Sequence, residues 1–446
     1  MAIHPIDFRY GTPGMKAVWS EENRFAAIVM SEVALAKAQA KHGMIPHEAS
    51  GEIADNAKKA SLERAKEIED EIHHDMMAVV RAVTEVCGES GRWIHYGATS
   101  NDILDTATGI QVKESLFLIE GKLKALLGVL LKRAGETKNL VCAGRTHGQI
   151  GVPTTYGLRF AIWASEVGRH IERLEQLRPR VAVGQMTGAV GTMAAMGDKG
   201  YDVMVSMMEF LELFPVDVSN QIVQRDRYAE YFMLLANIAT TLDKIGVEIR
   251  MMQRSEIGEM EESFGKKQVG SSTMPHKRNP IKSEQVCGLA RIVRSFVEPS
   301  LMNNTLWDER DLTNSSCERI TFPEASILAD HILDVMIKVL EGVRLNEANI
   351  RRNLNLLQGV NMAESIMIEL TKAGMDRQEA HELIRVSSMS AIELQKPLTE
   401  ILVNSEKVTG YLSEEKIREL LNPENYIGTA VRQVENIIDK LTLISI

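Results

Sequence analysis

The stretch "VGSSTMPHKRNPIKSE", residues 269–284, is the part of the sequence whose residue types most clearly suggest chemistry. It places the hydroxyls of Ser271 and Ser272 near the donors of Lys277 and Asn279, in a segment too polar and too rich in turn-formers for a core. When an enzyme removes a proton next to a carboxylate, negative charge accumulates on that carboxylate, and such donors stabilise it. We therefore interpret this segment as an anion-binding loop at a site of proton abstraction.

Other polar clusters stand out against the apolar-rich stretches around them. They are "DFRYG" (7–11), "HHDMMAVVR" (73–81) followed by "WIHYGATSND" (93–102), "GRTHGQIGVPTTYG" (144–157), "WDERDLTNSSCERI" (307–320) and, more weakly, "NQIVQRDRYAEY" (220–231). We treat all of them as candidate parts of a functional site.

The histidines and glycines of these clusters have alternative interpretations. His73, His74 and His95 could be metal ligands, but adjacent histidines on a helix point about 100° apart, and there is no HExxH motif or clustered carboxylate companion. We therefore expect no metal. His147 in "RTHGQ" could move a proton near neutral pH, although a lone loop histidine is more often structural. "GAVGT" at 188–192 lacks a Walker lysine and a GxGxxG pattern, which favours a turn or close helix packing.

Long helices are expected to position these clusters. Three proline-free stretches are rich in the helix formers Ala, Leu, Met, Glu and Lys, and they cover residues 47–152, 216–274 and 324–396. Ser20 is a candidate N-cap and Gly43 a candidate C-terminal glycine of an early helix. The stretches from Asp102 to about Lys138 and from Tyr228 to about Glu262 predict helices longer than three turns, as in a bundle. Strand signals are weak throughout, which predicts an all-α fold.

Composition and length restrict the class of protein. A chain of 446 residues exceeds the roughly 250–300 residues of a single core, so two or three domains are expected. The net charge of −10 is spread along the chain, which argues against nucleic-acid and membrane partners. The four cysteines form no CxxC pair, and we find neither a signal-peptide pattern nor a membrane-spanning apolar window. We expect a cytoplasmic protein.

The stretch "GSSTMPHKRNP", residues 270–280, resembles the signature of the fumarase/aspartase superfamily of lyases, GSSxMPxKxNP, without a gap. The other clusters resemble, in the same order, the adenylosuccinate lyase family of that superfamily: "RYG", "HHD", "HYGATSND", "RTHGQ", "QRDR" and "ERD…SSCERI". The resemblance extends from residue 7 to about residue 320 and is weakest in the C-terminal hundred residues.

The resemblance implies an all-α protein with three domains, for which we expect residues 1–100, a central long-helix bundle over 101–350, and residues 351–446. It implies a homotetramer whose active sites are each built from three subunits. It also implies β-elimination of fumarate from adenylosuccinate, giving AMP, and from the succinyl-carboxamide intermediate of purine synthesis (SAICAR). No metal or organic cofactor is implied.

The same resemblance assigns roles to residues. Ser271 would be the general base, which requires activation by its loop because a serine hydroxyl is a poor base, and His147 would be the general acid. Glu284 would orient a catalytic histidine, His74 would position substrate near the leaving nitrogen, and Lys277 with Asn279 would hold the charged carboxylate. The remaining predicted binding residues are Arg9, Tyr10, His73, Asp75, His95, Thr99, Ser100, Gln221, Ser272, Arg310, Ser315 and Arg319.

The sequence departs from the family pattern at four positions. His73 stands where relatives often have arginine or lysine, Asn314 where histidine is common, and Gln185 and Thr187 where lysine and serine are usual. None of these positions carries the predicted acid or base. The alternatives are argininosuccinate lyase, whose surrounding motifs differ, a carboxymuconate cycloisomerase, which typically lacks the histidine of "RTHGQ", and a non-enzymatic structural protein, which the retained catalytic set disfavours.

Overall fold

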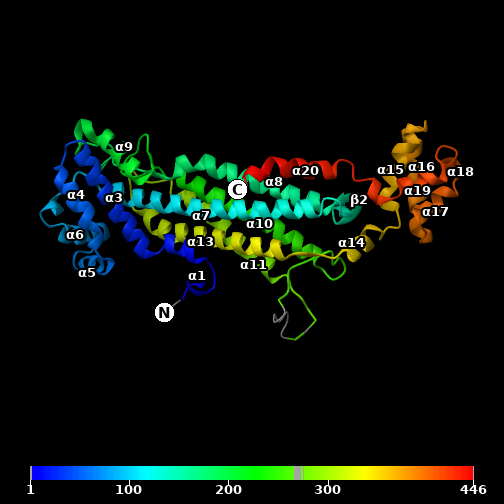
Figure 1. Cartoon of the computed structure of the whole chain (residues 1–446), viewed down its shortest axis with the longest axis horizontal. Coiled ribbons are helices and arrows are strands. Elements are labelled where there is room, and N and C mark those ends of the chain that lie inside the picture. The colour runs from blue at the N-terminus through cyan, green and yellow to red at the C-terminus, as the bar shows by residue number, and fades with distance from the viewer. Residues whose placement is uncertain (1–2, 266–272, 275, 445–446) are drawn as a thin grey trace. The chain divides into compact units, whose positions relative to one another are not determined.

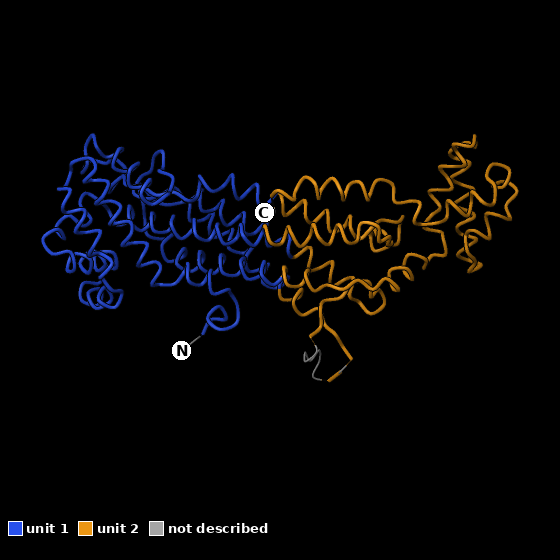
Figure 2. The backbone as a smooth tube through the Cα atoms, viewed as in Figure 1, with its two compact units in different colours: residues 1–123, 169–242, 286–335 blue, residues 124–168, 243–285, 336–446 orange. Residues whose placement is uncertain are grey.

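The computed structural model describes residues 3–265, 273–274 and 276–444 (Figure 1). The chain divides into two compact units, which are coloured separately in Figure 2. Unit 1 consists of residues 1–123, 169–242 and 286–335, and unit 2 of residues 124–168, 243–285 and 336–446. The predicted division into three domains near residues 100 and 350 stays a prediction.

The elements are mostly helices, which confirms the predicted all-α fold class. Unit 1 contains α1 (Pro5–Phe8), α2 (Pro13–Val18), α3 (Glu21–Lys41), α4 (His47–Asn56), α5 (Leu62–Ile72), α6 (Asp75–Val86), α9 (Gly200–Leu211) and α12 (Val297–Met302). Unit 2 contains α14 (Glu347–Leu354), α15 (Ala363–Lys372), α16 (Arg377–Leu394), α17 (Leu398–Val403), α18 (Glu406–Thr409), α19 (Glu414–Leu420) and α20 (Ala430–Leu441). Five helices have residues in both units: α7 (Ser100–Glu136), α8 (Tyr156–Val181), α10 (Asp226–Met252), α11 (Ile281–Ser295) and α13 (Thr313–Gly342).

Capping residues that the sequence predicts mark the two ends of α3. The Ser20 hydroxyl accepts the N–H of Asn23 at 3.2 Å and so begins α3, and Gly43, just after the helix, has a φ of +66°. The long helix predicted from Asp102 is confirmed as α7. The second long helix, α10, ends at Met252 rather than near Glu262, and it is followed by a turn over residues 253–257 and then by the short strand β5.

An aromatic cluster in unit 1 packs around Phe322 of α13. Its ring lies 5.5 Å from that of Trp19, 5.1 Å from Tyr228 and 5.0 Å from Phe232, measured between ring centroids. The next residue is Pro323, where an interior proline was expected to end a helix, yet α13 continues through it. We attribute this continuation to the buried aromatic contacts, whose packing energy offsets the lost hydrogen bond.

The strands form three two-stranded sheets within the described residues. The longest is a hairpin of β1 (Val141–Thr146) and β2 (Gln149–Thr155), which the sequence-based prediction missed. Its turn consists of His147 (φ +53°) and Gly148 (φ +77°), and two left-handed residues match the twist of a two-residue hairpin. The shorter pairs join β3 (Val183–Gly184) to β4 (Phe214–Pro215) and β5 (Met260–Glu261) to β6 (Arg344–Leu345).

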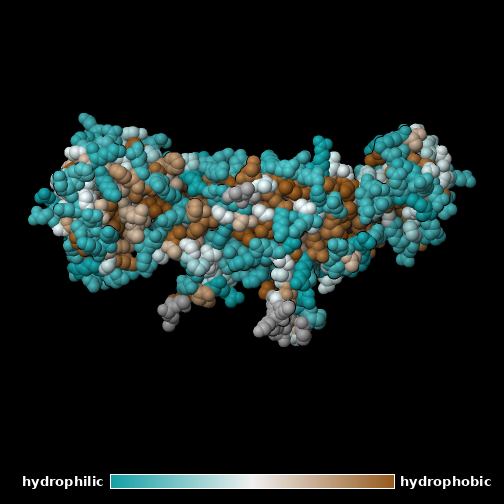
Figure 3. Space-filling view, viewed as in Figure 1, coloured by the Kyte–Doolittle hydropathy of each residue, from teal (hydrophilic) through white to brown (hydrophobic). Residues whose placement is uncertain are grey.

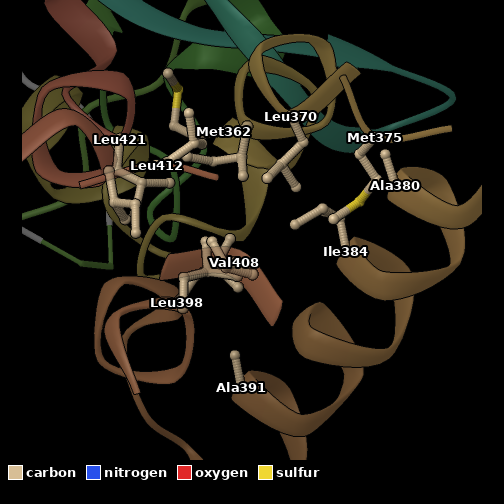
Figure 4. Close-up of a cluster of buried hydrophobic side chains, with 13 residues drawn as sticks. Met362, Leu370, Met375, Ala380, Ile384, Ala391, Leu398, Val408, Leu412 and Leu421 are labelled. Atoms are coloured by element: carbon tan, nitrogen blue, oxygen red, sulfur yellow. The ribbon is translucent and has the colours of Figure 1, made fainter. Parts of the chain in front are cut away.

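The C-terminal helices of unit 2 enclose their own apolar cluster (Figure 4). Met362, Leu370, Leu398 and Val408 are fully buried in it and come from the region of α15, α17 and α18. Burial of each such side chain contributes roughly 1.5–3 kcal/mol to folding. This part of unit 2 therefore has a core of its own.

Candidate active site

Two of the predicted site histidines lie at the junction between α5 and α6. His73 ends α5 in the left-handed conformation (φ +53°), and His74 is the N-cap of α6, where its Nδ1 accepts the N–H of Met77 at 3.3 Å. The two residues therefore do not lie on one helix, although the expectation of no metal site assumes that they do. Both side chains are exposed, and the junction fixes their backbone.

A cavity of about 370 Å³ in unit 1 brings together four predicted residues, Asp75, Arg310, Ser315 and Arg319. Arg319 donates to the Asp75 carboxylate at 2.7 Å, and Arg310 donates to Gln221 Oε1 at 3.0 Å. The structure thus links Gln221, another predicted residue, to the cavity wall. The ion pair and the amide contact hold two guanidinium groups at the cavity.

A buried charge cluster in the wall of this cavity was not predicted. Arg225 is 3% exposed and donates to both Asp105 oxygens, at 2.6 and 2.9 Å, and to both Glu318 oxygens, at 3.0 and 3.1 Å. Burial opposes the charged form, but the two carboxylates more than offset it and raise the pKa of Arg225. The motif "QRDR" contains Arg225, but nothing in the sequence shows that its partners lie on α7 and α13.

The cavity also includes Arg24, which sequence reasoning did not single out. Burial and the nearby positive charge of Arg319 lower the pKa of the Arg24 guanidinium. Asn101, Gln111, Asn314 and Arg310 also line the cavity, and each has a buried polar atom without a hydrogen-bond partner in the protein. The unpartnered atom of Arg310 is its Nε donor, which an anion would satisfy, and an anion would also favour the charged form of the arginines. The other three atoms are amide oxygens, which need a donor such as a ligand hydroxyl or N–H group.

His95 belongs to a separate, buried polar cluster of unit 1. Its Nδ1 lies 2.7 Å from Oε1 of Glu32, and its backbone N–H donates to Oε2 of the same carboxylate at 3.0 Å. Burial lowers the pKa of His95, but the Glu32 contact and the charge of Asp102 more than offset this, so the pKa is raised. Glu32 was missed, although an acidic residue inside the apolar run "IVMSEVALA" is a signal that would have found it.

Asp102 organises the neighbouring loops. Burial raises its pKa despite the backbone N–H groups that bond it, which belong to Thr99 (2.8 Å), Thr187 (2.8 Å) and Gly188 (3.1 Å). The "GAVGT" segment is therefore a turn held by a carboxylate, with Gly188 and Gly191 in the left-handed region, which confirms the turn interpretation. Ser100 begins α7 beside Thr99.

The N-terminal pair Arg9 and Tyr10 follows α1. Arg9 is the C-cap of that helix, and the Tyr10 ring lies 5.5 Å from the His331 ring. Neither residue lines the cavity. Their predicted role in binding the nucleotide stays a prediction.

In unit 2, His147 occupies the tip of the β1–β2 hairpin and is exposed. Together with His73 and His95, it is one of eight non-glycine residues with positive φ in the described parts of the chain. Left-handed backbone costs of order 1–3 kcal/mol for such residues and persists where surrounding structure enforces it, often at functional sites. Three predicted site histidines share this conformation, and their role in the site stays a prediction.

The signature segment also belongs to unit 2. Ser271 and Ser272 lie outside the described residues. Lys277 is exposed, Asn279 is half-buried, and Glu284 is exposed on the first turn of α11. Just before the segment, the buried Glu262 accepts the N–H groups of Lys282 (3.2 Å) and Ser283 (2.6 Å), and so caps α11 where the segment ends.

The described residues contain no group of three or more His, Cys, Asp or Glu side chains placed to hold a metal ion. Among the same residues, no helix is long and apolar enough to span a membrane.

Comparison with known proteins assigns the chain to a class of enzymes. A family model described as "Lyase" matches residues 7–294. The structure is similar to that of a fumarate lyase from Mesorhizobium sp. BNC1 (TM-score 0.88, 31% identity, 96% of this chain and 98% of that chain). It is also similar to that of the 3-carboxy-cis,cis-muconate lactonizing enzyme from Pseudomonas putida (TM-score 0.89, 30% identity, 99% of each chain). The protein is thus a lyase of the fumarase/aspartase superfamily.

Sequence relatives narrow this class. A second family model, "Adenylosuccinate lyase C-terminus", matches residues 359–437. The chain is 54% identical to the adenylosuccinate lyase of Archaeoglobus fulgidus over 438 residues, 98% of both chains, and 54% identical to that of Methanocaldococcus jannaschii over 445 residues, 99% of this chain and 96% of the other. The chain therefore belongs to the adenylosuccinate lyase family, as its motifs predicted, and is a carbon–nitrogen lyase.

Proposed function

We propose that the chain catalyses β-elimination of fumarate from adenylosuccinate, giving AMP, and from SAICAR, giving the free carboxamide nucleotide (AICAR). The observation that carries this proposal is the 54% identity to adenylosuccinate lyases over 98% of the chain. The cavity of unit 1 supports it, because Arg24, Arg310 and Arg319 with Ser315 offer the guanidinium and hydroxyl donors that suit a nucleotide phosphate.

The reaction requires one base, one acid and a site for the intermediate charge. Ser271 takes a proton from the succinyl carbon, and the electron pair moves onto the adjacent carboxylate, where Lys277 and Asn279 stabilise it. The electron pair then returns to form the double bond of fumarate as the carbon–nitrogen bond breaks. His147 protonates the departing nitrogen, and Glu284 orients a catalytic histidine. The proposed chemistry uses no metal or organic cofactor.

The remaining predicted residues bind substrate in this proposal. Thr99, Ser100 and Gln221 contact the succinyl portion together with Ser272, and His74 lies near the leaving nitrogen with His95 at the site wall. The nucleotide is held by Arg9, Tyr10, His73, Asp75, Arg310, Ser315 and Arg319.

We infer a homotetramer in the cytoplasm, with active sites shared between subunits. Large apolar side chains are exposed on the long helices, among them Phe117 of α7, Ile162 of α8 and Val247 of α10. Figure 3 shows apolar side chains gathered on the helical surface that it presents. Exposed apolar side chains of this size are typical of subunit interfaces, where a partner removes them from water.

The test is a proton NMR time course of the purified protein with adenylosuccinate, and separately with SAICAR, without added metal. We expect fumarate and the nucleotide product in equal amounts, and none with Ser271→Ala. A matched control is Ser295→Ala, because Ser295 is exposed and its hydroxyl donates to the carbonyl of Ile292, one turn back in the same helix, at 2.7 Å. Full activity of Ser271→Ala would reject the base assignment.

A second candidate, cycloisomerisation of carboxymuconate, is favoured only by the structural similarity to the lactonizing enzyme. The same time course with carboxymuconate, and with argininosuccinate, tests these alternatives. Turnover of either, with no fumarate released from adenylosuccinate, would replace the proposed substrate while leaving the superfamily assignment intact.

A further inference from the structure

Glu259 is a fully buried carboxylate of unit 2, placed immediately before β5. Its Oε1 accepts from Arg145 Nη2 at 2.5 Å and from Asn353 Nδ2 at 2.9 Å, and its Oε2 accepts from the Tyr156 hydroxyl at 2.6 Å. Burial alone would raise the pKa of Glu259, but these three donors more than offset it and lower the pKa. Glu259 is therefore an ionised, fully bonded carboxylate at neutral pH.

Two of these three donors flank the hairpin that carries His147. Arg145 lies in β1, two residues before His147, and Tyr156 begins α8 directly after β2 ends. The Glu259 carboxylate thus connects Arg145, close to the hairpin tip, to the first residue of α8, which follows the hairpin. The third donor, Asn353 of α14, also donates to the carbonyl of Ile257 at 2.9 Å and ties the carboxylate to the neighbouring helix.

The backbone of the hairpin is itself irregular. The strand register shifts between Ala143 and Arg145, and the tip is a strained left-handed turn at His147. A bulge changes the direction of a strand, so the position of Arg145 determines where the tip lies. Displacement of an acid by about 1 Å can cost a large factor in rate.

We propose that Glu259 is a positioning residue for His147: by fixing Arg145 and Tyr156, it holds the hairpin tip in the geometry for protonating the leaving nitrogen. This inference rests on the proposed role of His147 as the general acid. Glu259 itself touches no substrate. Its effect on the reaction passes entirely through the hairpin.

The test is Glu259→Gln in the full-length protein, assayed by steady-state release of fumarate from adenylosuccinate. The amide keeps the shape of the side chain but leaves the Arg145 guanidinium without its counter-charge. We expect kcat to fall by about 10–100-fold, the usual cost of losing a supporting residue, with KM changed less than about threefold. Glu261→Gln is the matched control, because Glu261 lies two residues away on β5 and pairs with Arg278 at the longer distance of 3.8 Å. This control is expected to keep wild-type kcat.

A double variant separates positioning from general stability. If Glu259 acts through His147, Glu259→Gln should cause no further loss of kcat in a His147→Ala protein. Multiplicative losses, or wild-type kcat in the single variant, would overturn the proposal. If Glu259→Gln does not fold, Arg145→Lys provides the same comparison, because it keeps the charge but loses the guanidinium geometry. Wild-type kcat in His147→Ala alone would instead reject the proposed acid.

Discussion

The predicted binding residues of unit 1 and the predicted catalytic residues of unit 2 differ in how the chain supports them. In unit 1, Arg319, Arg310 and His95 have carboxylate or amide partners, and four predicted residues already meet at one cavity. In unit 2, His147, Lys277 and Glu284 are exposed. The buried carboxylates near them bond neighbouring residues instead: Glu259 accepts from Arg145, and Glu262 accepts from the N–H of Ser283. The predicted binding residues of unit 1 are thus held by contacts within that unit, whereas the predicted catalytic side chains of unit 2 are exposed.

The largest expected effect is on kcat and comes from replacing His147, the exposed residue proposed as the general acid. His147→Ala should lower kcat about 10²–10⁴-fold, the usual contribution of general acid–base catalysis, while the free energy of unfolding hardly changes because the side chain is exposed. Steady-state kinetics and urea denaturation measure the two quantities. His381→Ala, which removes an exposed histidine from α16, is the control. A stable protein with unchanged kinetics would make His147 a structural residue and remove the contrast between the units.

Replacing Arg225, the buried cation of unit 1, should mainly lower the stability of the protein. Arg225→Met leaves Asp105 and Glu318 buried without their shared partner, so we expect the free energy of unfolding to fall by about 3–5 kcal/mol. Chemical denaturation is the measurement. Arg227→Met is the matched control, because Arg227 lies two residues away and pairs at 3.8 Å with Asp217, whose side chain is 97% exposed. An equal fall in the free energy of unfolding of the two variants would show that burial of the charge cluster contributes little to stability.

The cavity arginines should affect binding more than turnover. Arg319→Met removes a charged donor from the proposed phosphate site, and a hydrogen bond to a charged group contributes about 1.5–3 kcal/mol, so kcat/KM should fall about 10–100-fold, mainly through KM. The comparison substrate is succinyladenosine, which lacks the phosphate and should be cleaved equally by both proteins. An equal loss on both substrates would mean that Arg319 does not contact the phosphate.

The smallest expected effect is the pH dependence of the His95–Glu32 pair. Because the pKa of His95 is raised in the folded protein, its stabilising contribution is complete below the unfolded value of about 6.5 and is lost as pH rises through the folded pKa. Glu32→Gln should therefore reduce stability more at pH 6 than at pH 9, and NMR should show a lower pKa for the His95 imidazole. A destabilisation independent of pH would indicate that Glu32 acts only by packing.

The residues that the sequence identified and those that it missed differ in kind. Motifs such as "RTHGQ" and "ERD…SSCERI" selected the candidates His147, Arg310 and Arg319, because each lies in a short polar cluster that stands out from the sequence around it. Glu259 and Glu32 were missed, because each is a single acidic residue whose role depends on a partner far away in the sequence. The hairpin was missed as well, since its turn uses His-Gly in place of the more familiar Asn-Gly.

The sequence alone determined the helical class, the capped start of α3, the length of α7, the family and the set of candidate site residues, because these depend on local spacing and short motifs. The tertiary structure decided which of those residues meet. It placed Asp75, Arg310, Ser315 and Arg319 at one cavity, buried Arg225 between carboxylates of α7 and α13, and fixed His147 in a left-handed turn. These features arise from contacts between segments distant in the chain, whose register is determined only when the helices pack.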